Sequence, residues 1–490
     1  MNNNYRLPKN KSLILLIVIL SITLYFPINY LMKVVLDIYL NKGSLNISGL
    51  NNIKFLSSNF LYFYITFVFL LLLILTIKVK IIRILSKLFS INLIIVLFLA
   101  FLVRILWMIL FPTGPVGDYI EYNNIALTFA ETNSFPYPNI PYLPVGSIFI
   151  FGLIYKLFGS YLIIIKIFHI VISFFTIILF YKITFRLFGE KIASIFVVIY
   201  SFYPSHISMI NITSPEVTMT FLFALFIYIF IASKNVWNKY IILGIIGGLL
   251  LYIKPVFIFA LIVPFVYNIS IKKYRNIVKS ISIPVIALLI ILPFSLSYGH
   301  LFIVNTSGGI NLLIGNNDNS IGTYFTPSKI KELKNVNIEN MSTFEQNKQY
   351  SKLAMDFIIK NPTKFILLIP KKLFHLLFKD TSMLTLSFEG LKIDNTVKWI
   401  LYIFNSIYYY LIMLIAILSF SRKYIQKNLS SYLILTSFIL SILLMFIIFF
   451  GMDRYKYPFM PLIIIFASQF IKQLLDKNNV SHNQIMPKVK

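Results

Sequence analysis

Long apolar runs constrain this chain more than any other feature. Five of them approach or exceed the roughly 20 residues needed to cross a hydrocarbon core of about 30 Å: Ser12–Met32, Phe60–Ile77, Ile91–Phe111, Tyr161–Phe180 and Tyr432–Phe450. Charged residues make up only 12% of the 490 residues, half the usual share of a soluble domain. Because a spanning segment must satisfy its own backbone hydrogen bonds, the sequence predicts an all-α integral membrane protein.

Three simpler interpretations are excluded or set aside. The first run follows basic residues but lacks a small-x-small cleavage site, so we interpret it as an uncleaved helix and not as a signal peptide. Cysteine is absent, which excludes disulfides and thiolate metal sites. The net charge of +28 does not indicate nucleic-acid binding, because the basic residues form no aromatic-interleaved soluble patch.

The placement of charge predicts the topology. With a cytoplasmic N-terminus, basic clusters such as Lys78–Lys87, Lys272–Lys279 and Arg422–Lys427 fall repeatedly on the inner side, as the positive-inside rule requires. Of sixteen acidic residues, only Glu190 and Asp476 then lie inside. We expect about 12 spans, both termini in the cytoplasm, and residence in a plasma membrane. The residue composition of the chain is typical of AT-rich codon usage, which suggests a bacterium.

Four regions are expected along the chain. These are a two-span extension (1–90), a membrane core (91–296) with a first outer loop (112–160), a large external loop (297–397), and the last spans with a cytoplasmic tail (398–490). Proline and glycine break the apolar stretch Tyr142–Phe158, so we place it along the outer interface. A loop of about 100 residues is usually functional. Within it, Ser342 and Glu345 are spaced as a capping box, and an amphipathic stretch runs from Pro362 to Phe378.

The acidic candidates lie at outer helix starts. Asp118 occupies a Gly/Pro turn, and Glu121 lies one helical turn further on. Such a carboxylate can act as a general base or ligate a hard metal, although helix capping is an equally open interpretation of Asp118. Glu216 follows Pro215 at another helix start, where helix initiation explains it as well as function does. We interpret His206 as a solvated loop histidine.

The basic candidates lie at membrane depth on the outer side. Arg104 is within an apolar span, where a charge indicates function unless it snorkels to the interface. Lys254 ends a span before Pro255, and Arg454 and Lys456 share a short outer loop. Cations there suit an anionic ligand at headgroup level, such as a lipid phosphate; ordinary phospholipid binding is the alternative.

The order of these features resembles the GT-C superfamily of polyprenyl-phosphate-sugar glycosyltransferases. It is most similar to glycosyltransferase family 39, which holds protein O-mannosyltransferases and lipid A aminoarabinose transferases. The motifs that carry the resemblance are Asp118-x-x-x-Tyr122, Pro144–Gly159, Arg186–Gly189, Glu216, Ser307–Leu312 with Asn316 and Asn317, Asn361-Pro362, and Arg454-Tyr455 with Pro458. The sequence departs from the mannosyltransferase branch, since Tyr119 and not an acid follows Asp118, and two extra spans precede the matching region.

The resemblance implies a GT-C-like helical bundle with interfacial juxtamembrane helices. It also implies transfer, with inversion, of a sugar from a polyprenyl phosphate to a glycan, lipid or protein acceptor outside the cytoplasm. Asp118 would be the base, with Glu121 and Glu216 as further catalytic candidates, and a divalent metal on Asp118 and Glu216 is possible. The substrate-binding candidates are Arg104, Tyr122, Lys254, Asn316, Asn317, Arg454, Tyr455 and Lys456. Membrane lipids would surround the protein, and no nucleic acid is expected as a partner.

Two other functions stay open at this point. A polysaccharide polymerase or ligase has a similar span number and a large outer loop, but would depend on outer arginines more than on an acid. A lipid or sugar transporter would need mid-membrane breaks or charges in several spans together with internal repeats. Mid-span charges other than Arg104 are sparse, and no repeat is apparent.

Overall fold

The chain divides into two compact units, Met1–Leu88 and Phe89–Lys490. The computed structural model describes Phe89 and residues 92–135, 141–233, 236–300, 304–333, 341–420 and 428–483. All of these lie in the second unit, so the predicted spans Ser12–Met32 and Phe60–Ile77 fall outside the described residues. The region boundaries predicted above stay predictions.

Every regular element among the described residues is a helix, as the apolar runs predicted. The membrane-core helices are α4 (Leu93–Leu110), α5 (Tyr119–Thr132), α6 (Val145–Phe158), α7 (Leu162–Phe188), α8 (Glu190–Ser201), α9 (Pro204–Ser208), η1 (Met209–Asn211), α10 (Pro215–Ala232), α11 (Trp237–Ile253), η2 (Pro255–Ile262), α12 (Val263–Ser270) and α13 (Tyr274–Ser297). The later helices are α14 (Gly308–Gly315), η3 (Pro327–Lys329), η4 (Lys331–Leu333), α15 (Thr343–Lys360), α16 (Pro362–Leu377), α17 (Ser382–Phe388), α18 (Asn395–Leu418), α20 (Leu429–Ile448), η5 (Asp453–Lys456) and α21 (Met460–Asn483).

Six described helices are long and apolar enough to cross a membrane: α4, α7, α10, α13, α18 and α20. A seventh span results if α8 and the α9–η1 segment, bent by 58°, count as one. The chain is therefore a multi-pass membrane protein of all-α class. The predicted total of about 12 spans stays a prediction, since part of the chain lies outside the described residues.

Burial separates a central helix from peripheral ones. Inside the protein, 61% of the apolar window of α10 is buried, against 22% for α4, α13 and α18. The exposed apolar faces of the peripheral helices suit lipid, whereas α10 is enclosed by α7 and α11. The first turn of α10 is thus positioned inside the protein, which matters for Glu216.

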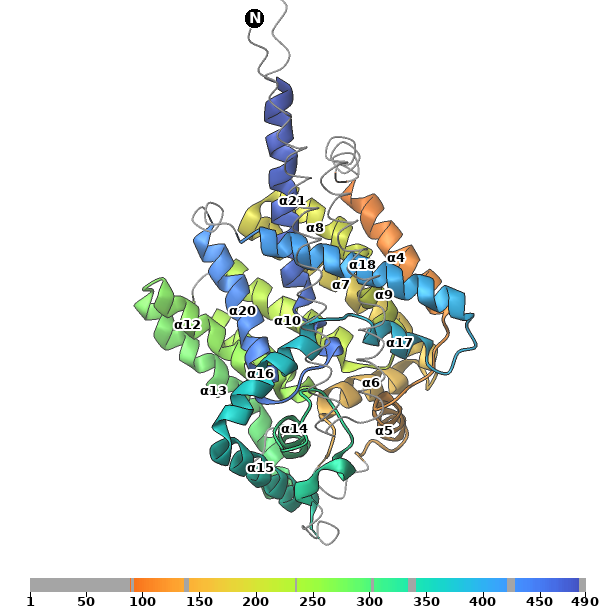
Figure 1. Cartoon of the computed structure of the whole chain (residues 1–490), viewed down its shortest axis with the longest axis vertical. Coiled ribbons are helices and arrows are strands. Elements are labelled where there is room, and N and C mark those ends of the chain that lie inside the picture. Colours follow the sequence, from red (N-terminus) through yellow and green to blue (C-terminus); the bar gives the residue numbers. More distant parts are fainter. Residues whose placement is uncertain are drawn as a thin grey trace, which may run out of the picture. The chain divides into compact units, whose positions relative to one another are not determined.

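The helices at one end of this unit come from the first and the late predicted loops. Figure 1 shows α5, α6, α14 and α15 toward one end, while α21 runs to the opposite end. α6 has 14 residues, too few to cross a bilayer at about 1.5 Å per residue, and it packs against α5. The predicted capping box is confirmed, because the Ser342 hydroxyl accepts from Glu345 N while the Glu345 carboxylate accepts from Ser342 N. The predicted restart at Pro362 is also confirmed as the first residue of α16.

Candidate active site

An accessible ion pair joins two segments that lie 336 positions apart. Nη2 of Arg454, in η5, lies 3.1 Å from Oδ2 of Asp118, which immediately precedes α5. The Asp118 side chain is 64% exposed, and that of Arg454 is 16% exposed. The structure therefore brings the predicted base and a predicted phosphate-binding cation together at a place that a ligand can reach.

The backbone around Asp118 turns sharply into α5. Gly117 has a φ of +52°, a left-handed conformation that glycine adopts without strain, and Tyr119 N donates to Val116 O across the turn. Asp118 occupies the N-cap position, yet its side chain makes no capping hydrogen bond. The capping interpretation of Asp118 is therefore wrong for this structure, because its carboxylate faces Arg454 instead of the α5 amides.

A second, buried ion pair lies beside the first. Oε1 of Glu216 in the first turn of α10 is 3.0 Å from Nζ of Lys254, which follows α11. The Glu216 side chain is only 1% exposed, whereas Lys254 is 23% exposed. Burial of a carboxylate requires a partner charge, and Lys254 supplies it. Pro255 ends α11 at this lysine, because a proline disfavours helical conformation in the preceding residue.

The Tyr455 ring connects the two ion pairs, and the Tyr119 ring lies against Arg454. The Lys254 ammonium lies 5.0 Å from the centre of the Tyr455 ring, and the Arg454 guanidinium lies 5.5 Å from the same ring. The guanidinium also lies 5.7 Å from the Tyr119 ring, whose hydroxyl accepts a 3.4 Å hydrogen bond from Nη1. Tyr119 was missed at the sequence level, although its position directly after Asp118 was a usable signal. Cation–π contacts of this kind hold Lys254 and Arg454 against the same ring, that of Tyr455.

Two buried polar atoms in this cluster have no hydrogen-bond partner among the described residues. They are Oε2 of Glu216 and Nε of Arg454, an acceptor and a donor respectively. A buried polar atom left unsatisfied costs about 1–3 kcal/mol, so such atoms in a native fold usually serve a ligand or water. We refer to Asp118, Tyr119, Glu216, Lys254, Arg454 and Tyr455 as the acid–base cluster.

The other candidate residues of the predicted first outer loop lie next to this cluster. Glu121 is exposed one turn along α5, and partial burial, followed by the nearby charge of Asp118, raises its pKa above the ordinary value. Tyr122 is buried, with its ring centre 6.2 Å from that of Tyr119. Tyr122 therefore supports the ring that lies under Arg454.

The residues predicted to bind a divalent metal, Asp118 and Glu216, provide few free oxygen ligands. Within the described ranges, no group of three His, Asp or Glu side chains is gathered. Asp118 and Glu216 are each already paired with a cation, and hard metals prefer several oxygen ligands. The residues present do not fit a metal site, and no step below passes through one.

Arg104 and His206 lie in the interior. Arg104 is 1% exposed and donates from Nε to Ser173 Oγ and from Nη1 to the carbonyls of Ala100 and Ser201. The snorkelling alternative is therefore wrong. The solvated-loop interpretation of His206 is also wrong, since it is buried and stacks on Tyr457 with ring centres 3.7 Å apart.

Asn316 and Asn317 hold the turn after α14 together. The Asn316 amide donates to Leu312 O and Ile448 O and accepts 2.8 Å from Nζ of Lys372. The Asn317 amide donates to two carbonyls of α14. Substrate binding by these residues stays a prediction, and their contacts assign them a structural role in this state.

Lys456 is committed to a different partner from the one predicted. Its Nζ lies 3.1 Å from Oδ1 of Asp380, and both side chains are 0% exposed. A buried ammonium needs a counter-charge, and Asp380 supplies it in place of a lipid phosphate. We therefore leave Lys456 out of the donor site proposed below.

Comparison with known proteins gives one family match. Residues 143–298 match the family model described as dolichyl-phosphate-mannose-protein mannosyltransferase. No curated protein sequence matches the chain.

Among solved structures, the oligosaccharyltransferase AglB of Archaeoglobus fulgidus, in complex with an inhibitory peptide and a dolichol-phosphate, is 14% identical, with a TM-score of 0.47. That match covers 81% of this chain and 52% of the other, so the chain spans about half the length of the oligosaccharyltransferase. ArnT of Cupriavidus metallidurans, bound to undecaprenyl phosphate, is 11% identical over 75% of this chain and 77% of that one, with a TM-score of 0.39.

The matched segment contains α6 to α13, and with them Glu216 and Lys254 of the acid–base cluster. It lies within the region that the sequence motifs had indicated. Over residues 143–298, the chain is therefore similar to the family that the sequence motifs had indicated.

Proposed function

We propose that this protein is a membrane glycosyltransferase that moves a sugar from a polyprenyl-phosphate donor to an acceptor on the extracytoplasmic face. The observation that carries the proposal is the contact between the accessible Asp118 carboxylate and the Arg454 guanidinium, beside the buried Glu216–Lys254 pair. A general base and a phosphate-binding cation are the two groups that such a transfer needs most. The family match over residues 143–298 supports the same class of reaction.

In this proposal, the ion pair between Asp118 and Arg454 is the resting state of the site, and substrate binding replaces it. Because the Asp118 carboxylate is 64% exposed, water screens this ion pair on the Asp118 side, and a pair of this kind contributes about 0–1 kcal/mol. An incoming donor phosphate would therefore displace Asp118 from Arg454 at small cost. Arg454 then binds the phosphate through its guanidinium fork, and its unpartnered Nε adds a donor.

The transfer step follows from this exchange. The released Asp118 carboxylate takes the proton of the acceptor hydroxyl or amide as the acceptor oxygen or nitrogen bonds to the anomeric carbon. The bond from that carbon to the phosphate oxygen breaks, and its electron pair leaves with the polyprenyl phosphate. Attack opposite the leaving group inverts the configuration. Positive charge on Arg454 and Lys254 stabilises the leaving oxygen as its negative charge develops.

Glu216 has a fixed supporting role in this proposal. Lys254 holds one carboxylate oxygen, and the other is buried without a partner among the described residues. That oxygen is an acceptor for a hydroxyl of the bound sugar or an N–H of the acceptor. A site that hydrogen-bonds a substrate hydroxyl discriminates strongly against analogues that lack it, so Glu216 would contribute specificity.

The test is sugar transfer by the purified protein in detergent, with a panel of polyprenyl-phosphate sugars and a mixed acceptor extract. Wild type is compared with Asp118→Asn, and thermal melting verifies that both are folded. We expect wild type to release polyprenyl phosphate and the variant to release about 10²- to 10⁴-fold less, because a general base contributes that much.

The matched control is Asp318→Asn, which neutralises another exposed aspartate paired with a lysine, Lys364. It should leave release unchanged. Equal release by wild type and Asp118→Asn would remove Asp118 as the base. Release by neither, with intact folding and the whole donor panel tried, would contradict the proposed function and favour a polymerase or a transporter.

A further inference from the structure

The segment that carries Arg454 is fastened on its opposite side by buried polar contacts. η5 spans only four residues, Asp453 to Lys456. Arg454 lies between Asp453 and Lys456, whose side chains both contact the segment between α16 and α17, residues 378–381, which we call the α16–α17 junction. So short a 3₁₀ turn has few backbone hydrogen bonds of its own. What holds Arg454 in place must therefore come largely from side-chain contacts around it.

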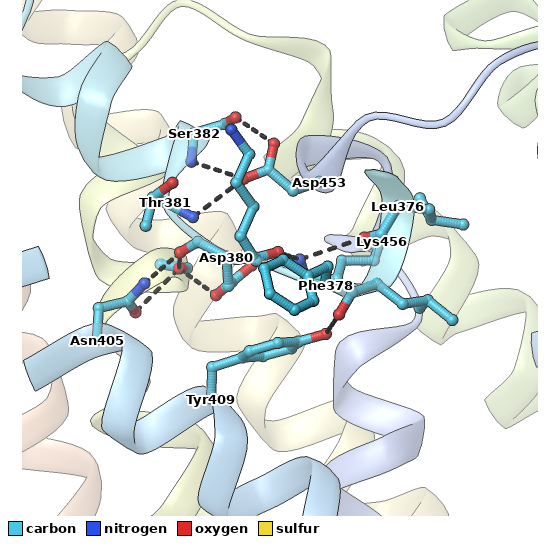
Figure 2. A network of polar contacts seen from close by, with 12 residues as sticks. Leu376, Phe378, Asp380, Thr381, Ser382, Asn405, Tyr409, Asp453 and Lys456 are labelled. Atoms are coloured by element: carbon cyan, nitrogen blue, oxygen red, sulfur yellow. Dashed lines mark hydrogen bonds and ion pairs between the residues drawn. The ribbon is translucent and has the colours of Figure 1, made fainter. Parts of the chain in front are cut away.

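Lys456 provides the inner contact. Its ammonium pairs with Asp380 and donates to the carbonyls of Leu376 and Lys379, as Figure 2 shows for the Asp380 and Leu376 contacts. It also lies 4.5 Å from the centre of the Tyr409 ring. The ammonium thus meets the last turn of α16, the junction after it and α18 at once.

Asp380 is in turn surrounded by donors. Its second carboxylate oxygen accepts from the hydroxyls of Tyr203 and Ser205, and its backbone carbonyl accepts from the Asn405 amide. A fully buried carboxylate with this many partners has a single defined position. Lys456 is therefore tied to a fixed point in the protein interior.

Asp453 provides the outer contact. Its Oδ2 accepts from the backbone N–H groups of both Thr381 and Ser382, each at 3.0 Å, and its other oxygen accepts from the Ser382 hydroxyl. Figure 2 shows Asp453 capping the start of α17 in this way. The carboxylate also lies where the helix dipole favours negative charge.

The residue before this turn is packed equally tightly. Gly451 N donates to Gly322 O at 3.0 Å, and a Cβ at Gly451 would overlap Lys372 O of α16. The whole segment from Gly451 to Lys456 is therefore attached to the elements of the late region, 322–382. None of these anchoring contacts is made by the acid–base cluster itself.

We propose that Asp380, Asp453 and Lys456 are positioning residues, which together form a buried anchor that holds the Arg454 guanidinium against Asp118. The inference rests on the proposed function, in which Arg454 binds the donor phosphate. It adds that the α16–α17 junction determines where that cation stands. Displacement of this junction, for example when an acceptor binds to the late external region, would move Arg454 and alter turnover without touching Asp118.

The first measurement is hydrogen exchange on the full-length protein in detergent, for wild type, Asp380→Asn and Asp453→Asn. We expect faster exchange in both variants at the amides of Tyr455, Tyr457, Thr381 and Ser382, which the anchor orders, with α10 and α21 unchanged. Asp318→Asn is the control for loss of a lysine-paired carboxylate and should exchange like wild type. Where Asp380→Asn does not fold, Asp453→Asn and the neutral pair Asp380→Asn/Lys456→Gln carry the same test.

The second measurement is a double-mutant cycle on turnover with Arg454→Ala. In the wild-type background, Asp453→Asn should lower kcat about 10- to 100-fold and raise KM for the donor, as expected when the charge that binds the donor phosphate is misplaced. In the Arg454→Ala background it should cause no further loss, because the anchor acts through Arg454.

Each outcome decides the inference. If folded anchor variants exchange the η5 amides at the same rate as wild type, the inference is overturned, whether or not transfer is detected. Equal losses of kcat in both backgrounds would also overturn it, since the anchor would then act independently of Arg454. Failure of wild type to transfer any sugar would defeat the proposed function alone, and the exchange data would still decide whether the anchor holds η5.

Discussion

Arg454 and Lys456 lie two positions apart in one short turn, but their ion pairs differ in how far they are exposed to water. The Asp118–Arg454 pair has a carboxylate that is 64% exposed, whereas both side chains of the Asp380–Lys456 pair are 0% exposed. The N···O distance is 3.1 Å in each. Distance alone therefore does not separate a replaceable contact from a permanent one.

Burial makes that separation. Water screens the outer pair, so a competing anion replaces it at small cost. The inner pair has no water to take over its hydrogen bonds, and losing one partner leaves an uncompensated charge. One turn thus combines a cation that a ligand can approach with a cation that fixes the turn, and substitutions at the two positions should affect different properties.

Among substitutions of the two η5 cations, the largest expected effect is on turnover from Arg454→Ala. Removing a preorganised charge from the position where the leaving oxygen becomes negative costs about 10²- to 10³-fold in kcat. The melting temperature should fall less than in a variant of Lys456, because the carboxylate left without a partner, Asp118, is 64% exposed. Kinetics and thermal melting of the same preparation provide the check. Arg454→Lys should recover part of the loss, since it restores charge without the guanidinium fork. A large drop in melting temperature with normal kcat would reverse the assignment of the two cations.

The next effect is on stability, from Lys456→Met. This change leaves Asp380 buried and unpaired, which costs about 3–5 kcal/mol. The melting temperature should fall sharply, and the yield of folded protein with it. The double variant Lys456→Met/Asp380→Asn should recover most of the loss, because it removes the uncompensated charge. A melting temperature equal to wild type in the single variant would show that the buried pair does not hold the turn.

Sequence reasoning named both residues of the exposed pair, but of the buried pair it named only Lys456 and assigned it the wrong partner. Asp118, Glu216, Lys254 and Arg454 each stood out locally, at predicted helix ends or in turns where charge is unexpected. Their mutual contacts were not predictable, because they depend on tertiary packing between segments up to 336 positions apart.

The buried residues had weaker signals. Asp380 and Asp453 resembled ordinary loop acids, and the basic residue next to each, Lys379 and Arg454, was only a weak clue. His206 was misassigned for the same physical reason, since its stacking partner Tyr457 is remote in sequence. Helix class and the α15 cap were predictable because periodicity and capping are local properties.

A third cation, Lys372, extends the comparison to pH. It is fully buried, donates to Asn316 Oδ1 and to the last carbonyls of α20, and has no carboxylate partner among the described residues. Burial lowers its pKa to about 7. Between about pH 7 and pH 10 the unfolded chain keeps a proton that the folded protein has released, so stability rises with pH in that window.

The slope from this one group is at most about 1.4 kcal/mol per pH unit. Melting temperatures of wild type and Lys372→Met between pH 6 and pH 9.5 would test it. The advantage of wild type over the variant should grow as the pH rises. A constant difference over the whole range would mean that Lys372 keeps its proton in the folded protein.

The smallest effect should come from Asp318→Asn, and it sharpens the comparison most directly. Asp318 and Lys364 lie 2.8 Å apart, closer than either pair on η5, but their side chains are 53% and 61% exposed. If burial and not distance sets the energy, this loss should cost no more than about 1 kcal/mol and leave turnover unchanged. The residual cost should disappear in 1 M salt, where the Debye length falls to about 3 Å. A cost as large as that of Lys456→Met would show that distance governs these pairs, and the distinction between a replaceable and a permanent contact on η5 would fail.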